Sequence, residues 1–99
     1  MKTTPKATAL LKQMKTVTRM ERGKVCQMKA RKHFNHQTWK NGRNHVRYVP
    51  REQVEDLRAA IDGYSRFMKL VQLYADEIIS LTRREHARKY PKHPLKHPN

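Results

Sequence analysis

An apolar series between residues 54 and 78 constrains the fold of this chain more than any other feature. Its members recur at intervals of three and four positions: Val54, Leu57, Ile61, Tyr64, Met68, Val71, Ala75 and Ile78. Such alternation places them on one face of a helix and is typical of a heptad seam. Pro50 suits the first helical position and Pro91 blocks a regular continuation. We therefore predict one long amphipathic helix over residues 50–88.

A shorter helical segment precedes it. Thr4-Pro5 has the form of an N-cap followed by a first-turn proline. An apolar stripe then follows on one helical face: Ala7, Leu10, Leu11, Met14 and Val17. We predict a basic N-terminal helix within residues 1–22, too short to cover the whole seam of the long helix.

The uncovered part of the seam predicts assembly, either as a homodimer or on a larger protein partner. The expected assembly residues are Leu57, Ile61, Tyr64, Met68, Val71 and Ile78. The alternative is an intramolecular helical hairpin that needs no partner.

Residues 23–49 carry strand and turn signals. Asn41-Gly42 is the strongest of them, because both residues tolerate the positive φ of a type I′ turn. A two-residue loop there pairs Lys40 with Arg43 and fixes the register of a basic β-hairpin. Residues 23–28 could supply a third strand. With the two helices, these signals predict an α+β fold that is mainly α.

Side chains on paired strands alternate between the two faces of the hairpin. One face collects the aromatic and amide residues Trp39, Val46, Tyr48, Asn35, Gln37 and Asn44. The other face collects His36, Thr38, Lys40, Arg43, His45 and Arg47, with Phe34 and Val49 at its base. We expect the aromatic face to pack on the long helix, with Trp39 in the core. The alternative for Trp39 is stacking on an unpaired base of single-stranded DNA or RNA.

Charge is segregated along the chain. The 99 residues carry 23 Lys and Arg against 8 Asp and Glu, a net charge of +15. Residues 1–50 hold 13 of the bases and one acid, Glu21, whereas residues 51–82 hold four bases and six acids. Solubility alone does not require this segregation. The basic part therefore indicates a polyanion partner, and the near-neutral helix indicates a surface that contacts protein.

The predicted nucleic-acid-binding residues lie on the cationic face of the hairpin and just ahead of it. Arg and Lys on a two-stranded ribbon can reach phosphates or guanine edges in the major groove of DNA. The predicted set is Lys29, Arg31, Lys32, His36, Lys40, Arg43, His45 and Arg47. Residues 89–99 are predicted to form a flexible basic tail that adds phosphate contacts.

The sequence gives little support for a metal site, a catalytic site or a membrane segment. Cys26, His33, His36 and His45 lack the paired spacings of a structural zinc site, so we expect no metal and no cofactor. No Gly-rich phosphate loop, catalytic triad or paired-acid site can be assembled, so we expect no enzyme activity. The lone cysteine and the lack of an apolar leader or membrane-length apolar run favour a cytoplasmic protein with no membrane partner.

The stretch from Gly23 to about Leu81 resembles an uncharacterised family of small bacterial and archaeal proteins associated with transposases. The shared pattern is an aromatic strand, a glycine-containing turn, RYVP, and a helix with an acidic start and a centre of the type Y-x-R-F. It reads here as Trp39-Lys40-Asn41-Gly42, Arg47-Tyr48-Val49-Pro50, Val54-Glu55-Asp56-Leu57 and Tyr64-Ser65-Arg66-Phe67. The resemblance implies a mobile-element or phage-like context and an accessory role in DNA or RNA binding.

Two functions from different classes follow from these patterns. The first is a non-enzymatic accessory protein that binds DNA or RNA, associated with the nucleoid or with a ribonucleoprotein. The second is a structural adaptor whose helix docks a larger protein within a nucleoprotein complex. Membrane-surface binding ranks third, because the amphipathic helix lies in a segment of net negative charge.

Overall fold

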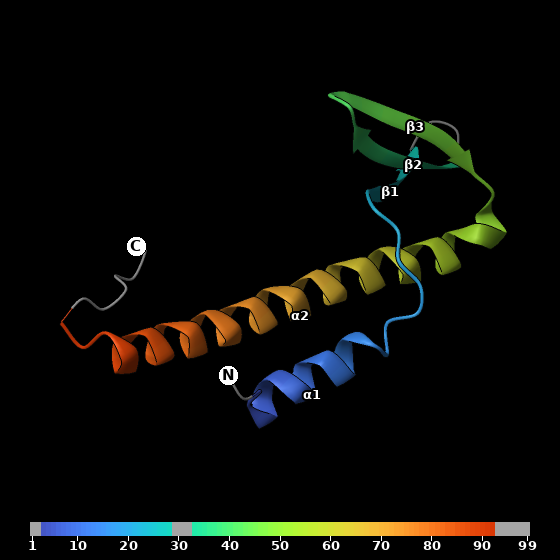
Figure 1. The fold of residues 1–99 in the computed structure, drawn as a ribbon. Helices are drawn as coiled ribbons and strands as arrows, with labels where there is room; N and C mark the ends of the chain where they lie inside the picture. The colour runs from blue at the N-terminus through green and yellow to red at the C-terminus, as the bar shows by residue number, and fades with distance from the viewer. Residues whose placement is uncertain (1–2, 29–32, 93–99) are drawn as a thin grey trace. The chain divides into compact units, whose positions relative to one another are not determined.

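The computed structural model describes residues 3–28 and 33–92. Its elements are α1 (Pro5–Met14), β1 (Lys24–Met28), β2 (His33–Lys40), β3 (Arg43–Val49) and α2 (Arg51–Lys89) (Figure 1). The fold is α+β and mainly α, as the sequence predicted, and the third strand is present. The described residues form two compact units. One comprises Val17–Phe67, and the other joins the residues up to Thr16 to those from Met68 onward.

In the unit that contains α1, the side chain of Thr4 connects the two helices. Its Oγ1 accepts a hydrogen bond from the backbone N–H of Ala7 at 3.1 Å and donates one to Oε2 of Glu77 on α2 at 2.6 Å. Pro5 follows in the first helical turn, so the predicted cap is confirmed. The hydroxyl of Thr4 thus both starts α1 and attaches it to α2.

The apolar contact of this unit is small. Ala7 and Leu10 of α1 and Leu70 of α2 are its buried hydrophobic residues among those described. Because α1 ends at Met14, Val17 lies beyond the helix and does not extend its apolar stripe. The core is accordingly confined to the middle of α1.

In the other unit, the three strands form an antiparallel sheet in the order β1-β2-β3 (Figure 1). Asn41 and Gly42 have φ values of 54° and 74°, as a type I′ turn requires, and Lys40 pairs with Arg43. The predicted turn and register are therefore confirmed. In β1, Val25 pairs with His36 and shares its face of the sheet.

The segment between α1 and β1 runs against α2 within this unit. The N–H of Glu21 donates to the carbonyl of Ala60 at 2.9 Å. A Cβ added at Gly63 would lie 2.2 Å from the carbonyl oxygen of Arg19, a distance that a real side chain does not tolerate. Glycine at position 63 lowers the helix propensity of α2. It also leaves the space that the backbone carbonyl of Arg19 occupies.

The sheet packs with the opposite face from the one that we predicted. Val49 and His36 are 1% and 4% exposed, whereas Trp39, Tyr48 and Val46 are 73%, 62% and 53% exposed. The prediction that Trp39 belongs to the core was therefore wrong. Val49 directly precedes Pro50 and α2, so its side chain must be covered where the chain enters the helix. Strand alternation then determines which other residues face inward.

The guanidinium of Arg58 on α2 contributes to the covered side of the sheet. It lies 5.6 Å from the centre of the Phe34 ring, at a distance where a cation and an aromatic ring attract each other. Phe34 pairs with Val49 across β2 and β3. These contacts place the base of the sheet, rather than Trp39 and Tyr48, against the helix.

α2 begins at Arg51 and ends at Lys89, within one residue of the predicted bounds. Of its predicted seam, Val54 is buried, Met68 is exposed, and Leu57, Ile61, Tyr64, Val71 and Ile78 are half-buried. The seam therefore stays partly accessible within each unit.

Among the described residues, neither helix combines the length and the apolar character needed to cross a membrane.

Candidate nucleic-acid interface

The exposed side of the sheet, which we call the outer face, combines aromatic, amide and basic side chains. Its composition follows from the pairing of Lys24 with Gln37 and of Trp39 with Asn44. The outer face comprises Lys24, Cys26 and Met28 of β1, His33, Asn35, Gln37 and Trp39 of β2, and Asn44, Val46 and Tyr48 of β3. No carboxylate belongs to this set.

Trp39 and Tyr48 are the two large exposed rings of the outer face. Tyr48 pairs with Asn35, which lies four residues from Trp39 along β2, so the two rings are offset by about 14 Å along the strands. The ring of His33 meets that of Tyr48 edge-on, with 5.6 Å between centroids. The aromatic surface is therefore extended rather than a single cluster.

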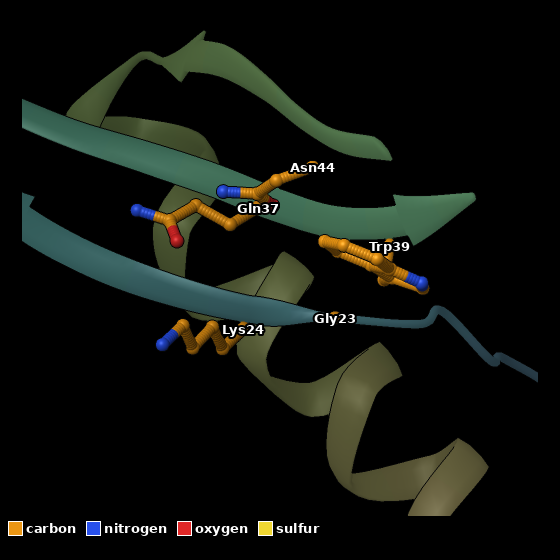
Figure 2. A pocket seen from close by; sticks show the side chains of 5 residues that line it. All are labelled: Gly23, Lys24, Gln37, Trp39 and Asn44. Carbon is orange, nitrogen blue, oxygen red and sulfur yellow. The ribbon is translucent and has the colours of Figure 1, made fainter. Parts of the chain in front are cut away.

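An open cavity of about 440 Å³ lies on the outer face, lined by Gly23, Lys24, Gln37, Trp39 and Asn44. Figure 2 shows the indole at one end, beside the start of β1, and the Gln37 amide and the Lys24 side chain toward the other. Gly23 has a φ of 91°, and a Cβ there would lie 2.0 Å from the Gln37 carbonyl oxygen. Glycine is thus required for β1 to approach β2 at this end of the cavity.

His36, a predicted nucleic-acid ligand, is instead a structural residue. Its Nε2 lies 2.7 Å from the carbonyl oxygen of Arg22, and its Nδ1 accepts from Nε of Arg47 at 3.1 Å. Both ring nitrogens are therefore used inside the protein, and the ring is 4% exposed. The assignment of His36 to the binding surface was wrong, because it faces the covered side of the sheet.

The other described members of the predicted set remain accessible. Lys40, Arg43, His45 and Arg47 are exposed, and the first three lie close to the turn of the hairpin. The Nε2 of His45 is 3.2 Å from the carbonyl oxygen of Lys40, which draws the imidazole toward the turn. Nε of Arg47 donates a hydrogen bond to His36. The residue is nevertheless exposed, and its terminal guanidinium nitrogens are accessible.

The remaining predicted ligands lie outside the described residues. These are Lys29, Arg31 and Lys32, together with the tail from His93 onward. Their contribution to the surface stays a prediction.

Arg22 is a further cation in this unit. Its guanidinium lies 5.4 Å from the centre of the Tyr64 ring, and its Nε donates to the Tyr64 hydroxyl at 3.4 Å. The hydrogen bond and the electrostatic interaction with Tyr64, and then the charge of Glu21, raise the pKa of Arg22 above its ordinary value. Arg22 lies beside a cavity of about 310 Å³ that Met20, Glu21 and Tyr64 also line.

The sequence analysis did not select Lys24, Gln37 and Asn44 of the outer face. For Trp39 it preferred the core and kept stacking on an unpaired base as the alternative. A signal for the correct face was nevertheless present, because Val49 stands next to the helix and fixes which side of the strand is covered. In the described parts of the chain, no three His, Cys, Asp or Glu side chains are grouped so that they could hold a metal ion.

Comparisons with protein-family models, with curated proteins and with solved structures found no match to this chain. The interpretation of the surface therefore depends on the chemistry of its own residues.

Proposed function

We propose that the protein is a non-enzymatic accessory factor that binds DNA or RNA through the outer face of its sheet and the cationic end of its hairpin. The observation that carries this proposal is the exposure of Trp39 and Tyr48 on a sheet whose strands contain no carboxylate. A mobile-element or phage nucleoprotein complex in the cytoplasm is the setting that the family resemblance favours.

The charge of the sheet segment suits a phosphate backbone. Residues 24–49 contain seven Lys or Arg and no Asp or Glu. A chain segment of this charge attracts a polyanion over a Debye length of about 8 Å at physiological salt and neutralises phosphates on contact. The attraction does not depend on base sequence, so we expect tolerant binding.

The uncharged groups of the outer face add the contacts that bases require. Gln37 and Asn44 each present a donor and an acceptor, which match the edges of bases. Trp39 and Tyr48 offer ring faces on which bases stack. A surface made only for solubility has no need of two large exposed aromatic rings beside amides and cations.

Assembly through α2 is the second part of the proposal. Met68 and Ile79 are 44% and 43% exposed, and their separation of 11 residues brings them to one side of the helix. A second copy of the chain or a larger protein would cover such a stripe. Assembly would also multiply the basic surfaces presented to one nucleic acid.

A salt series on two matched triple variants tests the binding proposal. Fluorescence anisotropy of a labelled oligonucleotide gives the Kd of the wild-type protein and of the variant Lys40→Ala, Arg43→Ala, Arg47→Gln. The amide introduced at position 47 can still donate to the buried His36, and circular dichroism checks that the variant folds. We expect weaker binding and a shallower slope of log affinity against log salt, by up to about 2–3 for three lost phosphate contacts.

The control is the variant Lys12→Ala, Lys69→Ala, Arg84→Ala, which removes the same charge from exposed positions of the two helices. It should keep most of the affinity, because its positions lie outside the sheet. Equal losses in the two variants would show that net charge alone drives binding and would remove the hairpin from the proposal.

The adaptor function is the second candidate, and the exposed Met68 and Ile79 favour it. In that case the tagged protein should retain a specific protein partner after nuclease treatment and at high salt. Loss of every partner upon nuclease treatment would instead favour direct nucleic-acid binding.

A further inference from the structure

The cavity beside Trp39 brings one aromatic ring and two side-chain amides together on the outer face. Its volume of about 440 Å³ falls in the range of about 300–1,000 Å³ that is usual for small-ligand sites. Trp39 supplies an aromatic wall, and the side-chain amides of Gln37 and Asn44 supply donors and acceptors (Figure 2). We infer that this cavity holds a single unpaired base, so that the protein prefers single-stranded nucleic acid to duplex. This inference rests on the proposed function and specifies its substrate.

The exposure of Trp39 is the first argument. A side chain that is 73% exposed contributes little to the core. A large apolar ring in contact with water is unfavourable, so its presence on the surface points to a role in binding. Stacking of a base on an aromatic ring is worth about 1–3 kcal/mol and does not depend on the identity of the base. An exposed indole at the end of a cavity that two side-chain amides also line provides such a platform.

The amides are the second argument. Within the described residues, no hydrogen bond occupies the side chain of Gln37 or of Asn44. Both amides share the outer face with the indole, because Trp39 pairs with Asn44 and Gln37 lies two residues before Trp39 on β2. Their groups are therefore available to the edge of a base that stacks on the ring.

A single strand and a duplex differ in the access that they give to the faces of their bases. In a duplex, each base is covered by its neighbours above and below, so an indole can reach a ring face only by forcing bases apart. In a single strand the ring faces and the pairing edges are both accessible. A cavity that joins a stacking surface to amides therefore fits the unpaired base better than the intact groove.

Lys24 is the fourth element, because it brings a positive charge to the same cavity. Its ammonium group can pair with a phosphate next to the bound base. The surrounding strands contain no carboxylate that would compete for it. Stacking, edge recognition and phosphate neutralisation thus come together over a few positions of one sheet.

Trp39 is the single tryptophan of the chain, so its fluorescence reports directly on this cavity. The full-length protein is titrated with a ten-nucleotide oligothymidine, with oligouridine of the same length and with a ten-base-pair duplex. We expect the single strands to quench the Trp39 emission. The ratio of the affinities for oligothymidine and oligouridine shows whether DNA or RNA is preferred. The duplex should cause less quenching and bind more weakly at equal salt.

Two substitutions complete the test, with affinity measured by anisotropy. Trp39→Ala should weaken single-strand binding about 5- to 150-fold, the equivalent of one stacked base, and change duplex affinity less than about twofold. Trp39→Phe should restore much of the loss because it keeps a ring. Circular dichroism checks that both variants fold, as expected for so exposed a position.

The outcomes separate the inference from the proposed function. Tight binding with no quenching, no effect of Trp39→Ala or a preference for duplex would overturn the unpaired-base site and leave nucleic-acid binding intact. Absence of binding to all three probes at low salt would overturn the proposed function itself, and the site with it.

Discussion

Nε of Arg47 donates a hydrogen bond to Nδ1 of His36 across β2 and β3, at 3.1 Å. Since Nδ1 accepts this bond, the ring proton of a neutral His36 resides on Nε2, which then donates to the carbonyl of Arg22 at 2.7 Å. One buried imidazole therefore connects β3 to the segment that leads into β1. It holds the covered side of the sheet while the outer face stays open.

Replacement of His36 should destabilise the protein. His36→Phe keeps a ring of similar size but removes both hydrogen bonds, so we expect the free energy of unfolding to fall by about 1–3 kcal/mol. Urea denaturation measures the change. His45→Phe is the matched control, because His45 is exposed, and it should cost less than about 0.5 kcal/mol. Equal costs at the two positions would contradict the structural role of His36.

The Gly63→Ala substitution tests the position of the segment before β1, because the sign of the stability change depends on it. In an exposed helix, Gly→Ala stabilises by about 1 kcal/mol. Here the new Cβ would lie 2.2 Å from the Arg19 carbonyl oxygen, so overpacking should outweigh that gain and lower the urea midpoint. Ser65→Ala, at an exposed position of the same helix, is the control and should be neutral or slightly stabilising. A stabilised Gly63→Ala protein would show that the segment does not lie on α2.

Thr4 should hold α1 in place through its hydroxyl. Thr4→Ala loses both the cap to Ala7 and the bond to Glu77, and we expect a loss of about 1–2 kcal/mol that is concentrated in α1. Hydrogen exchange of the α1 amides detects this local opening. Thr4→Ser keeps the hydroxyl and should retain most of the protection. Similar exchange in the two variants would contradict the role of the oxygen.

Assembly through α2 predicts that charged substitutions on this helix lower the molecular mass of the protein's assembly in solution. Met68→Glu together with Ile79→Glu places charges on one exposed stripe, so any self-association through it should be lost. Sedimentation velocity should show a concentration-dependent oligomer for the wild type and a monomer for the variant. A wild-type protein that stays monomeric at high concentration would leave only a different protein as the partner of α2.

Local signals predicted much of the fold. Asn41-Gly42 determines the turn and, through it, the pairing of every residue in the hairpin. The spacing of apolar residues predicted α2 to within one residue at each end. Both features are encoded by neighbours in the sequence, so they can be derived without knowledge of tertiary contacts.

For the choice of the packing face, two local signals disagree: the hydrophobicity of one face, and the position of Val49 beside the helix on the other. Trp39, Val46 and Tyr48 form the more hydrophobic set, and burial of apolar area alone favours that set for the core. The structure instead covers Val49 and His36, because the chain enters α2 directly after Val49 and His36 bonds to the backbone of Arg22. The position of Val49 and the contact of His36 with Arg22 together decided the face, and the candidate site moved with it.

Chemical-shift mapping tests the central claim most directly, because the chain is small enough for amide assignment. A ¹⁵N-labelled sample is titrated with the ten-nucleotide oligothymidine, and the shifted amides are located on the structure. We predict the largest changes at Lys24, Gln37, Trp39 and Asn44 on the outer face, with smaller changes near the hairpin turn. Changes confined to α1 and α2, or no changes at low salt, would contradict it.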